Sequence, residues 1–381
     1  MKNEVKKIGT YKRITEELKN DKFFWGLIFF IFILHLLTYP SIHNISDEQL
    51  YLDVASRICK LNFSDFTGKE TGRIHGPLYH TILCLTSPFH HFELGKAEII
   101  NFVFIILGIV GWYFSTPLVS VETRKRLILL LFANNLLWTY SFRVLIDISI
   151  CMFLSLGLMN SYLFLEYKKK RNYYLTIIFI SLASLTSEIA FMFIPILFVY
   201  LLLKKNKNIL DWGLLILPFI PYGFYQLLIG FKDIWLYARM MEVTGMMNVS
   251  YIPYAHFPTI FYTIGVFGLG FISCVLAWKN MSKFDNMKNY FIFSLLIYLI
   301  WEIVFDFIAS VNLPRYNMTL IPFLALMISE NYEKDKKYRY LYYLTLIYSI
   351  MTGFIAAYYF HTSSLPIWRN QIIDITKIKI T

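Results

Sequence analysis

Apolar runs of about 20 residues recur along the whole 381-residue chain, and they constrain its fold more than any other feature. Hydrophobic residues make up 57% of the chain and charged residues only 16%. A soluble domain of this size could not cover so much apolar surface, whereas a bilayer accommodates each run as a helix whose backbone groups bond internally. The sequence therefore predicts an all-α, polytopic integral membrane protein with about 11 transmembrane helices, in a range of about 9 to 13.

The basic residues are distributed unevenly between the loops, which explains the net charge of +11. Most of them lie in loops on the side that carries the N-terminus. Because positively charged loops stay in the cytoplasm, this asymmetry places the N-terminus there. Anionic lipid headgroups are then the expected partner of the basic excess, and nucleic acid is not. The clusters on this side are Lys2–Lys22, Arg124–Arg126, Lys168–Arg171, Lys204–Lys207, Lys279–Lys288 and Lys334–Arg339.

Three segments follow from this topology. Residues 1–22 are expected to form a retained cytoplasmic amphipathic segment, since no small-residue cleavage site follows the first apolar run. Residues 23–361 would form the transmembrane domain, and residues 362–381 a short extracytoplasmic tail. We therefore expect a multi-pass protein of the cell membrane, and the abundance of Lys, Asn and Ile favours a prokaryotic source.

The expected spans differ in length, and the shorter ones leave their number open by one or two. Pro218 and Pro221 are predicted to kink the span in which they lie. The spans cover about residues 23–39, 97–119, 127–140, 145–166, 173–186, 189–203, 209–230, 258–278, 289–310, 316–330 and 340–361.

The four cysteines are widely separated and show no Cys-x-x-Cys spacing. We therefore expect neither a structural zinc site nor a disulfide framework. The four are Cys59, Cys84, Cys151 and Cys274.

Two long polar loops, residues 40–96 and 231–257, fall on the outer side and are the expected catalytic loops. In the first, Ser46 and Gln49 fit a capping box, and the helix that they open is predicted to be amphipathic and interfacial. The apolar stretch Pro77–His91 is too short to cross the membrane comfortably. We interpret it as a re-entrant or interfacial segment.

Acidic residues near the outer face are the first candidates for chemistry. Asp47 and Glu48 open the predicted interfacial helix, so they either complement its dipole or act on a substrate, and the two roles are compatible. Asp147 follows Arg143 by four residues, a spacing that would pair them on one helix face. A structural ion pair is the alternative to a functional role.

Three further acids are less clearly functional. Glu302 and Asp306 share a helix face in a predicted span, where they could bind a cation or relay protons. Alternatively, they could balance the charge of Arg315. We favour a structural role for Glu302 and leave Asp306 open. Glu188 lies between two spans, at the surface, where it would be solvated.

Basic residues in the outer loops are unexpected, because the positive-inside rule concentrates such residues in cytoplasmic loops. The few on the outer side therefore call for a functional explanation. Arginine suits a lipid-borne phosphate because its guanidinium binds phosphate in a bidentate fork. The candidates are Arg73, Arg143 and Arg315, with His75 beside the first. His75 and His80 lack a third convergent ligand, so we assign them no metal.

In this setting four short motifs resemble those of the polyprenyl-phosphate-dependent GT-C glycosyltransferases. The chain is most similar to the branch that contains protein O-mannosyltransferases and aminoarabinose transferases. The motifs occur in the family's order and all on the predicted outer side. They are Asp47-Glu48-Gln-Leu-Tyr51-Leu-Asp-Val-Ala55-Ser-Arg57, His75-Gly-Pro-Leu-Tyr79, Ser141-Phe-Arg143-Val-Leu-Ile-Asp147 and Pro314-Arg315-Tyr316-Asn-Met-Thr-Leu-Ile-Pro322.

The resemblance implies a GT-C fold and the transfer of a hexose or pentose from a polyprenyl phosphate to a hydroxyl of a glycan, lipid or protein. Asp47 would be the general base and the transfer would invert the anomeric centre. Glu48 and Asp147 would orient the acceptor or hold a divalent cation. Arg73, His75, Arg143 and Arg315 would bind the donor phosphate. Tyr51, Tyr79 and Tyr316 would position the substrates.

The sequence leaves several alternatives open. A divalent cation such as Mg²⁺ or Mn²⁺ is neither required nor excluded, and its ligands would be Asp47, Glu48 and Asp147. A transporter or flippase of a lipid-linked solute would share the many spans, but it predicts inverted repeats, of which the chain shows no sign. Within the superfamily, an oligosaccharide ligase or polymerase is the alternative.

Overall fold

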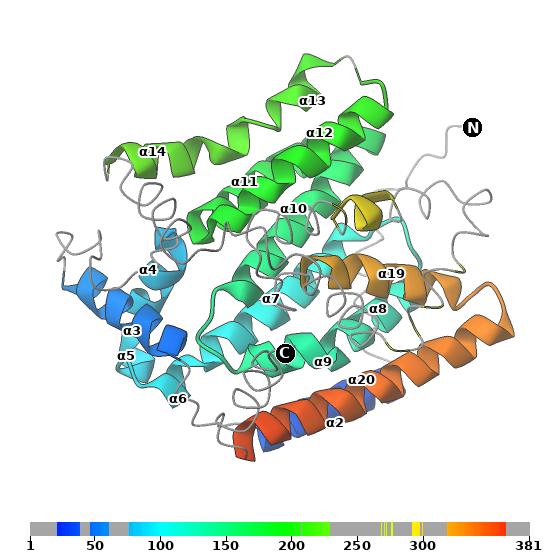
Figure 1. Cartoon of the computed structure of the whole chain (residues 1–381). Coiled ribbons are helices and arrows are strands. Elements are labelled where there is room, and N and C mark those ends of the chain that lie inside the picture. Colours follow the sequence, from blue (N-terminus) through cyan, green and yellow to red (C-terminus); the bar gives the residue numbers. More distant parts are fainter. Residues whose placement is uncertain are drawn as a thin grey trace, which may run out of the picture.

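The computed structural model describes residues 21–38, 46–60, 76–206, 208–228 and 318–362, with a few positions between 268 and 299. Within these ranges all regular secondary structure is helical, as predicted (Figure 1). The longer helices are α2 (Lys22–Leu37), α7 (Ile99–Ser115), α8 (Val121–Ala133), α10 (Asp147–Tyr167), α11 (Lys170–Thr186), α12 (Phe193–Leu203), α19 (Ile321–Asn331) and α20 (Lys336–Thr362).

Two helical segments of the described part, Leu94–Ser115 and Asp147–Tyr167, are long and apolar enough to cross a membrane. Shorter apolar helices cover Lys22–Leu37, Glu188–Leu203 and Met318–Asn331. The count of about 11 spans therefore stays a prediction. The segments 1–20, 231–257 and 363–381 lie outside the described residues, as do the expected spans near 258–310 for the most part.

Helix α10 lies at the centre of the bundle, between α7 and α11, and is buried almost from end to end. Its 21 residues extend about 31 Å, close to the thickness of a bilayer's hydrocarbon core. A Cβ atom on Gly157 would overlap the Ile180 side chain of α11, so glycine permits this close approach. A buried amide joins α10 to α7: the Asn160 side chain donates a hydrogen bond to the Ser115 hydroxyl at 3.1 Å.

The predicted span at 127–140 is divided into two helices at Asn134. The Asn134 side chain accepts hydrogen bonds from the backbone N–H groups of Leu136 and Leu137, both at 3.1 Å, and so caps α9 (Asn135–Ser141). The break thus leaves the first amide groups of α9 satisfied inside the protein.

Helices α2 and α20 cover this broken span from one side, where they lie next to each other (Figure 1). His35 of α2 stacks on Trp138 of α9, with ring centroids 4.0 Å apart, and its Nε2 lies 3.0 Å from the Phe132 carbonyl oxygen. The Trp138 indole donates to the Thr38 hydroxyl at 3.0 Å. These polar contacts order the first helix against the core.

The predicted kink near Pro218 is confirmed. Where one span was expected, the chain forms α13 (Ile209–Gly213), a 3₁₀ turn η3 (Leu217–Phe219) and α14 (Ile220–Leu228). Pro218 lies in the 3₁₀ turn, as expected for a residue that cannot donate to a helical ladder.

Charged side chains join helix ends at one end of the bundle. Lys125 at the start of α8 pairs with Asp21 at 2.8 Å, and Arg126 pairs with Glu333 beyond α19. Lys168 and Lys204 follow the ends of α10 and α12. Several of the predicted basic clusters are therefore brought to the same end, opposite to the N-terminus of α10.

Helix α3 (Ser46–Cys59) and three shorter helices, α4 (Pro77–Leu85), α5 (Ser87–His90) and α6 (Leu94–Ala97), form a corner at the other end (Figure 1). The helix predicted from Ser46 is present, and Val54 and Ile58 on its apolar face are buried. Helix α4 has nine residues, about 14 Å, so it cannot cross a bilayer, as expected for the stretch 77–91.

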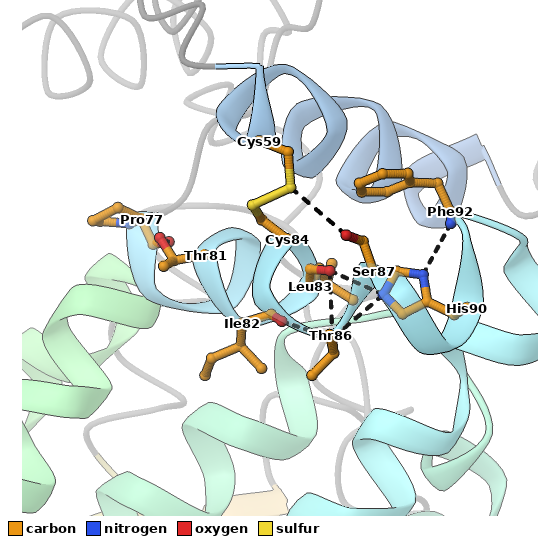
Figure 2. The surroundings of a disulfide bond; sticks show 10 residues. All are labelled: Cys59, Pro77, Thr81, Ile82, Leu83, Cys84, Thr86, Ser87, His90 and Phe92. Atoms are coloured by element: carbon orange, nitrogen blue, oxygen red, sulfur yellow. Dashed lines mark hydrogen bonds between the residues drawn. A yellow bond between two sulfur atoms is a disulfide. The ribbon is translucent and has the colours of Figure 1, made fainter.

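A disulfide joins this corner and corrects the sequence-based expectation that none would form. Cys59 at the end of α3 bonds to Cys84 of α4, with Cα atoms 5.4 Å apart (Figure 2). The two cysteines are 25 positions apart, and only the packing of α3 against α4 brings them together. The spacing of the cysteines along the sequence gave no indication that these two would pair.

His90 orders the turn between α5 and α6 (Figure 2). Its Nδ1 accepts from the Phe92 N–H at 3.0 Å, so Nε2 carries the proton and donates to the Leu83 carbonyl at 2.9 Å. Burial lowers the pKa of His90 from its ordinary value of 6.5, because the charged ring would lose solvation. The neutral ring is thus part of the folded corner.

We expect the double variant Cys59→Ser, Cys84→Ser to lose about 3.5 kcal/mol of stability, since opening a loop of this length restores chain entropy to the unfolded state. Thermal unfolding in detergent measures the loss. A reductant should lower the wild-type midpoint to that of the double variant and leave the variant unchanged. A wild-type midpoint insensitive to the reductant would contradict the bond.

Acidification should destabilise the corner through His90. Its folded pKa is lowered, so the unfolded chain binds the extra proton, and stability falls as the pH drops below 6.5. The measurement is the unfolding midpoint against pH for the wild type and for His90→Gln. The difference between the two should change with pH in this window. The control His91→Gln removes an exposed neighbour whose charge is only the smallest cause of the lowered His90 pKa, so it should keep most of the wild-type pH dependence.

Candidate active site

The acids that open α3 lie at the corner of short helices. Asp47 occupies the first turn of α3, but its side chain is outside the described residues. Glu48, one position later, is fully buried. Fully buried glutamates are rare unless other groups in the protein interact with them, so the groups around Glu48 indicate its role.

Tyr79 of α4 connects the corner to the central helices. Its hydroxyl donates to the Asn101 side chain of α7 at 3.2 Å. The Asn101 amide in turn donates to the carbonyl oxygens of Arg143 and Leu145, the latter at 2.6 Å. One buried asparagine therefore joins α4 and α7 to the segment that precedes α10.

The segment 142–146 is not helical, so Arg143 and Asp147 do not share one helix face as the sequence predicted. Helix α9 ends at Ser141 and α10 begins at Asp147. Asp147 instead lies in the first turn of α10, where its charge complements the helix dipole. Both side chains are buried, and the Arg143 guanidinium lies 5.8 Å from the centre of the Tyr140 ring.

Electrostatics show that Glu48, Tyr79 and Asp147 lie close together, although they come from three different helices. The pKa of Tyr79 is raised well above its usual value, mainly by burial and further by the charges of Glu48 and Asp147. The phenol therefore stays a neutral donor. Two of the predicted acids and one predicted positioning residue are thus brought together.

Glu98 belongs to this cluster and was not predicted. It is 1% exposed at the N-terminus of α7, and the charges of Glu48 and Arg143 act on its carboxyl group. Among the described residues its Oε2 has no hydrogen-bond partner. An acid one position into an apolar run was the available signal, since such acids are costly unless they are used.

Tyr51 and His80 form the wall of the site between α3 and α4. Their rings stack with centroids 5.4 Å apart, and the Tyr51 ring meets Tyr79 edge-on at 6.0 Å. Gly76 directly precedes α4 and lies against the end of α11, where a Cβ atom would overlap the Leu185 carbonyl oxygen. Glycine at this position therefore permits α4 to reach its place.

Several predicted residues lie outside the described residues, so their roles stay predictions. They are Arg73, His75, Arg315, Tyr316, Glu302 and Asp306. Glu188, expected at the surface, is half-buried in the turn after α11. Within the described part of the chain, no three His, Cys, Asp or Glu residues are grouped to hold a metal ion.

The bundle and its corner have the GT-C fold. No family model and no curated protein sequence matches the chain. The structure is similar to that of ArnT from Cupriavidus metallidurans in the apo state, with a TM-score of 0.58 at 12% identity over 88% of this chain and 75% of that one. It is also similar to an Archaeoglobus fulgidus oligosaccharyltransferase in complex with Zn and sulfate. That likeness has a TM-score of 0.55 at 13% identity over 93% and 56% of the two chains. The resemblance to the branch with aminoarabinose transferases is therefore confirmed at the level of the fold.

Replacing Asn101 by Leu should destabilise the protein by about 2–4 kcal/mol, because Tyr79 and two backbone carbonyls would lose a buried partner. Amide hydrogen exchange should rise at residues 143–147. The matched control is Asn160→Leu, which removes a buried amide from α10 far from its N-terminus. It should lower stability without raising exchange at 143–147. Equal exchange in both variants would contradict the bridging role.

Proposed function

We propose that the protein is a membrane glycosyltransferase that moves a sugar from a polyprenyl-phosphate donor to a hydroxyl of a glycan, lipid or protein in the cell envelope. The observation that carries the proposal is the cluster of Glu48, Tyr79 and Asp147 at one end of a GT-C bundle. Sugar transfer needs ionised or hydrogen-bonding groups that hold an acceptor hydroxyl beside a base, and acids with a neutral phenol suit that need.

Two features support an extracytoplasmic location of this site. The disulfide between Cys59 and Cys84 closes the corner, and disulfides persist in oxidising compartments. The basic clusters around Lys125 and Lys168 lie at the other end of the bundle, which suits the cytoplasmic side under the positive-inside rule. The N-terminus would then be cytoplasmic.

Asp47 is the proposed general base. It would take the proton of the acceptor hydroxyl as that oxygen attacks the anomeric carbon, while the bond from that carbon to the phosphate oxygen breaks. Attack from the face opposite the leaving group inverts the anomeric centre. Asp47 lies in the first turn of α3, where the helix dipole favours a negatively charged side chain.

The leaving polyprenyl phosphate needs positive charge rather than a protein acid. Arg143 is buried, and its charge interacts with Glu98, which supports the proposal that it is one of the cations that bind the phosphate. Arg73, His75 and Arg315 are the further proposed phosphate ligands. Tyr51 lies in the wall beside Tyr79, where both suit substrate positioning, and Tyr316 completes that proposed set.

Carboxylate oxygens suit Mg²⁺ or Mn²⁺. Should the reaction use such a cation, Glu48 and Asp147 together with Asp47 would hold it, and it would supply charge stabilisation to the phosphate.

A second activity within the superfamily is the transfer of whole glycans by a ligase or polymerase. The similarity to an oligosaccharyltransferase supports whole-glycan transfer as an alternative to the transfer of a single sugar. A transporter or flippase of a lipid-linked solute is the rival from another class. The length of the glycan on the donors that the protein accepts distinguishes the two transferase activities. Movement of a lipid-linked solute across the membrane, without any sugar transfer, would identify a transporter.

Asp47→Asn should lower sugar transfer by about 10²–10⁴-fold, because the amide cannot accept the proton. The assay uses membranes with a panel of radiolabelled polyprenyl-phosphate sugars. The matched control is Asp53→Asn, an exposed acid on the same helix that bonds Gln49 at 3.0 Å, and it should retain activity.

Full activity of Asp47→Asn would remove Asp47 from the mechanism. Transfer from no donor by the wild type, together with flux of a lipid-linked sugar in liposomes, would overturn the transferase proposal in favour of a transporter. Product stereochemistry tests the inverting step, and retention would contradict in-line attack.

A further inference from the structure

A cavity of about 470 Å³ opens at the end of the bundle opposite to the candidate active site. It lies where α10 and α12 end and α13 begins. Helix α10 connects the two places, with Asp147 at one end and Tyr167 next to the cavity at the other. The polar residues that line the cavity are Glu166, Lys168, Lys204, Lys205, Asn206 and Asn208.

Among the described residues that line the cavity, one lysine is left without an acidic partner. Lys168 pairs with the buried Asp211, and Lys204 pairs with Glu166 at 2.7 Å. Lys205 is exposed and, in the described part of the chain, forms no ion pair. The described lining therefore favours an anionic ligand.

Two of the lining lysines have backbone conformations that lysine rarely adopts. Lys168 has φ 52° and Lys205 has φ 49°, both in the left-handed region. Glycine or asparagine usually ends a helix in this way, because a Cβ atom is sterically disfavoured in the left-handed region. The helix dipole favours a lysine in the last turn, but it does not require the left-handed position. Two such lysines at one cavity therefore indicate a role for their side chains.

Exposed apolar side chains adjoin the cavity. Leu202 and Leu203 end α12, and Ile209 and Leu210 begin α13, with exposed fractions from 52% to 82%. They are next in sequence to Lys204 and Asn208, which line the cavity. A ligand that fits both surfaces needs an anionic head and apolar chains.

We propose that this cavity binds the headgroup of an anionic glycerophospholipid. The phosphodiester would lie beside Lys205, with Lys168 and Lys204 around it, and the acyl chains would cover Leu202, Leu203 and Ile209. Basic pockets between membrane helices recognise anionic headgroups in this way. The proposal concerns the face opposite to the catalytic corner and does not depend on the reaction there.

The test compares binding of phosphatidylglycerol and phosphatidylcholine to the purified full chain by native mass spectrometry. Lys205→Gly should weaken phosphatidylglycerol binding about fivefold and leave phosphatidylcholine binding unchanged, since one lysine near a membrane surface contributes about 1 kcal/mol. Its unfolding midpoint in neutral lipid should equal or exceed that of the wild type, because glycine relieves the left-handed strain.

The matched control is Lys169→Gln, an exposed lysine beside the cavity that does not line it, and it should bind as the wild type does. Lys205→Asn, which tolerates the same backbone, repeats the test with a second side chain. Wild-type affinity in both Lys205 variants would overturn the proposal. Equal binding of soluble glycerol phosphate would also overturn it, since the acyl chains would then contribute nothing.

Discussion

The fold depends on one constraint: backbone N–H and C=O groups inside a membrane bundle need partners within the protein. The chain breaks its helices at Asn134 and again at residues 142–146, and buried amides satisfy the groups freed there. Asn134 caps α9, and Asn101 donates to the carbonyls of Arg143 and Leu145. Non-helical backbone can therefore lie at the end of the bundle where the candidate site forms.

The break before α10 also explains why the site lies at this end. It places Asp147 at a helix N-terminus and positions Arg143 in a loop, while Asn101 connects both to Tyr79 of α4. Glu48 of α3 interacts with the Tyr79 phenol, and Glu98 of α7 interacts with Glu48 and with Arg143. The polar groups come from α3, α4, α7 and the start of α10, so the cluster exists only when the corner is packed on the bundle.

Local patterns predicted the parts of the molecule that depend on neighbouring residues. The helix from Ser46, the short apolar stretch from Pro77 and the kink at Pro218 follow from capping, length and proline chemistry. Contacts between distant segments were not predictable in this way. Cys59 and Cys84 have no spacing signal, and the expectation that Arg143 and Asp147 share one helix face was wrong because residues 142–146 are not helical.

The sequence by itself predicted a helical membrane protein with a polar loop that begins with two acids, because hydropathy and local propensity are properties of each segment. It also carried the motifs of the GT-C resemblance. Only the tertiary structure decided that Glu48, Tyr79, Glu98 and Asp147 share one site and that Lys168 and Lys205 share one cavity at the other end. The physical reason is that buried charges acquire their partners through helix packing, which no single segment encodes.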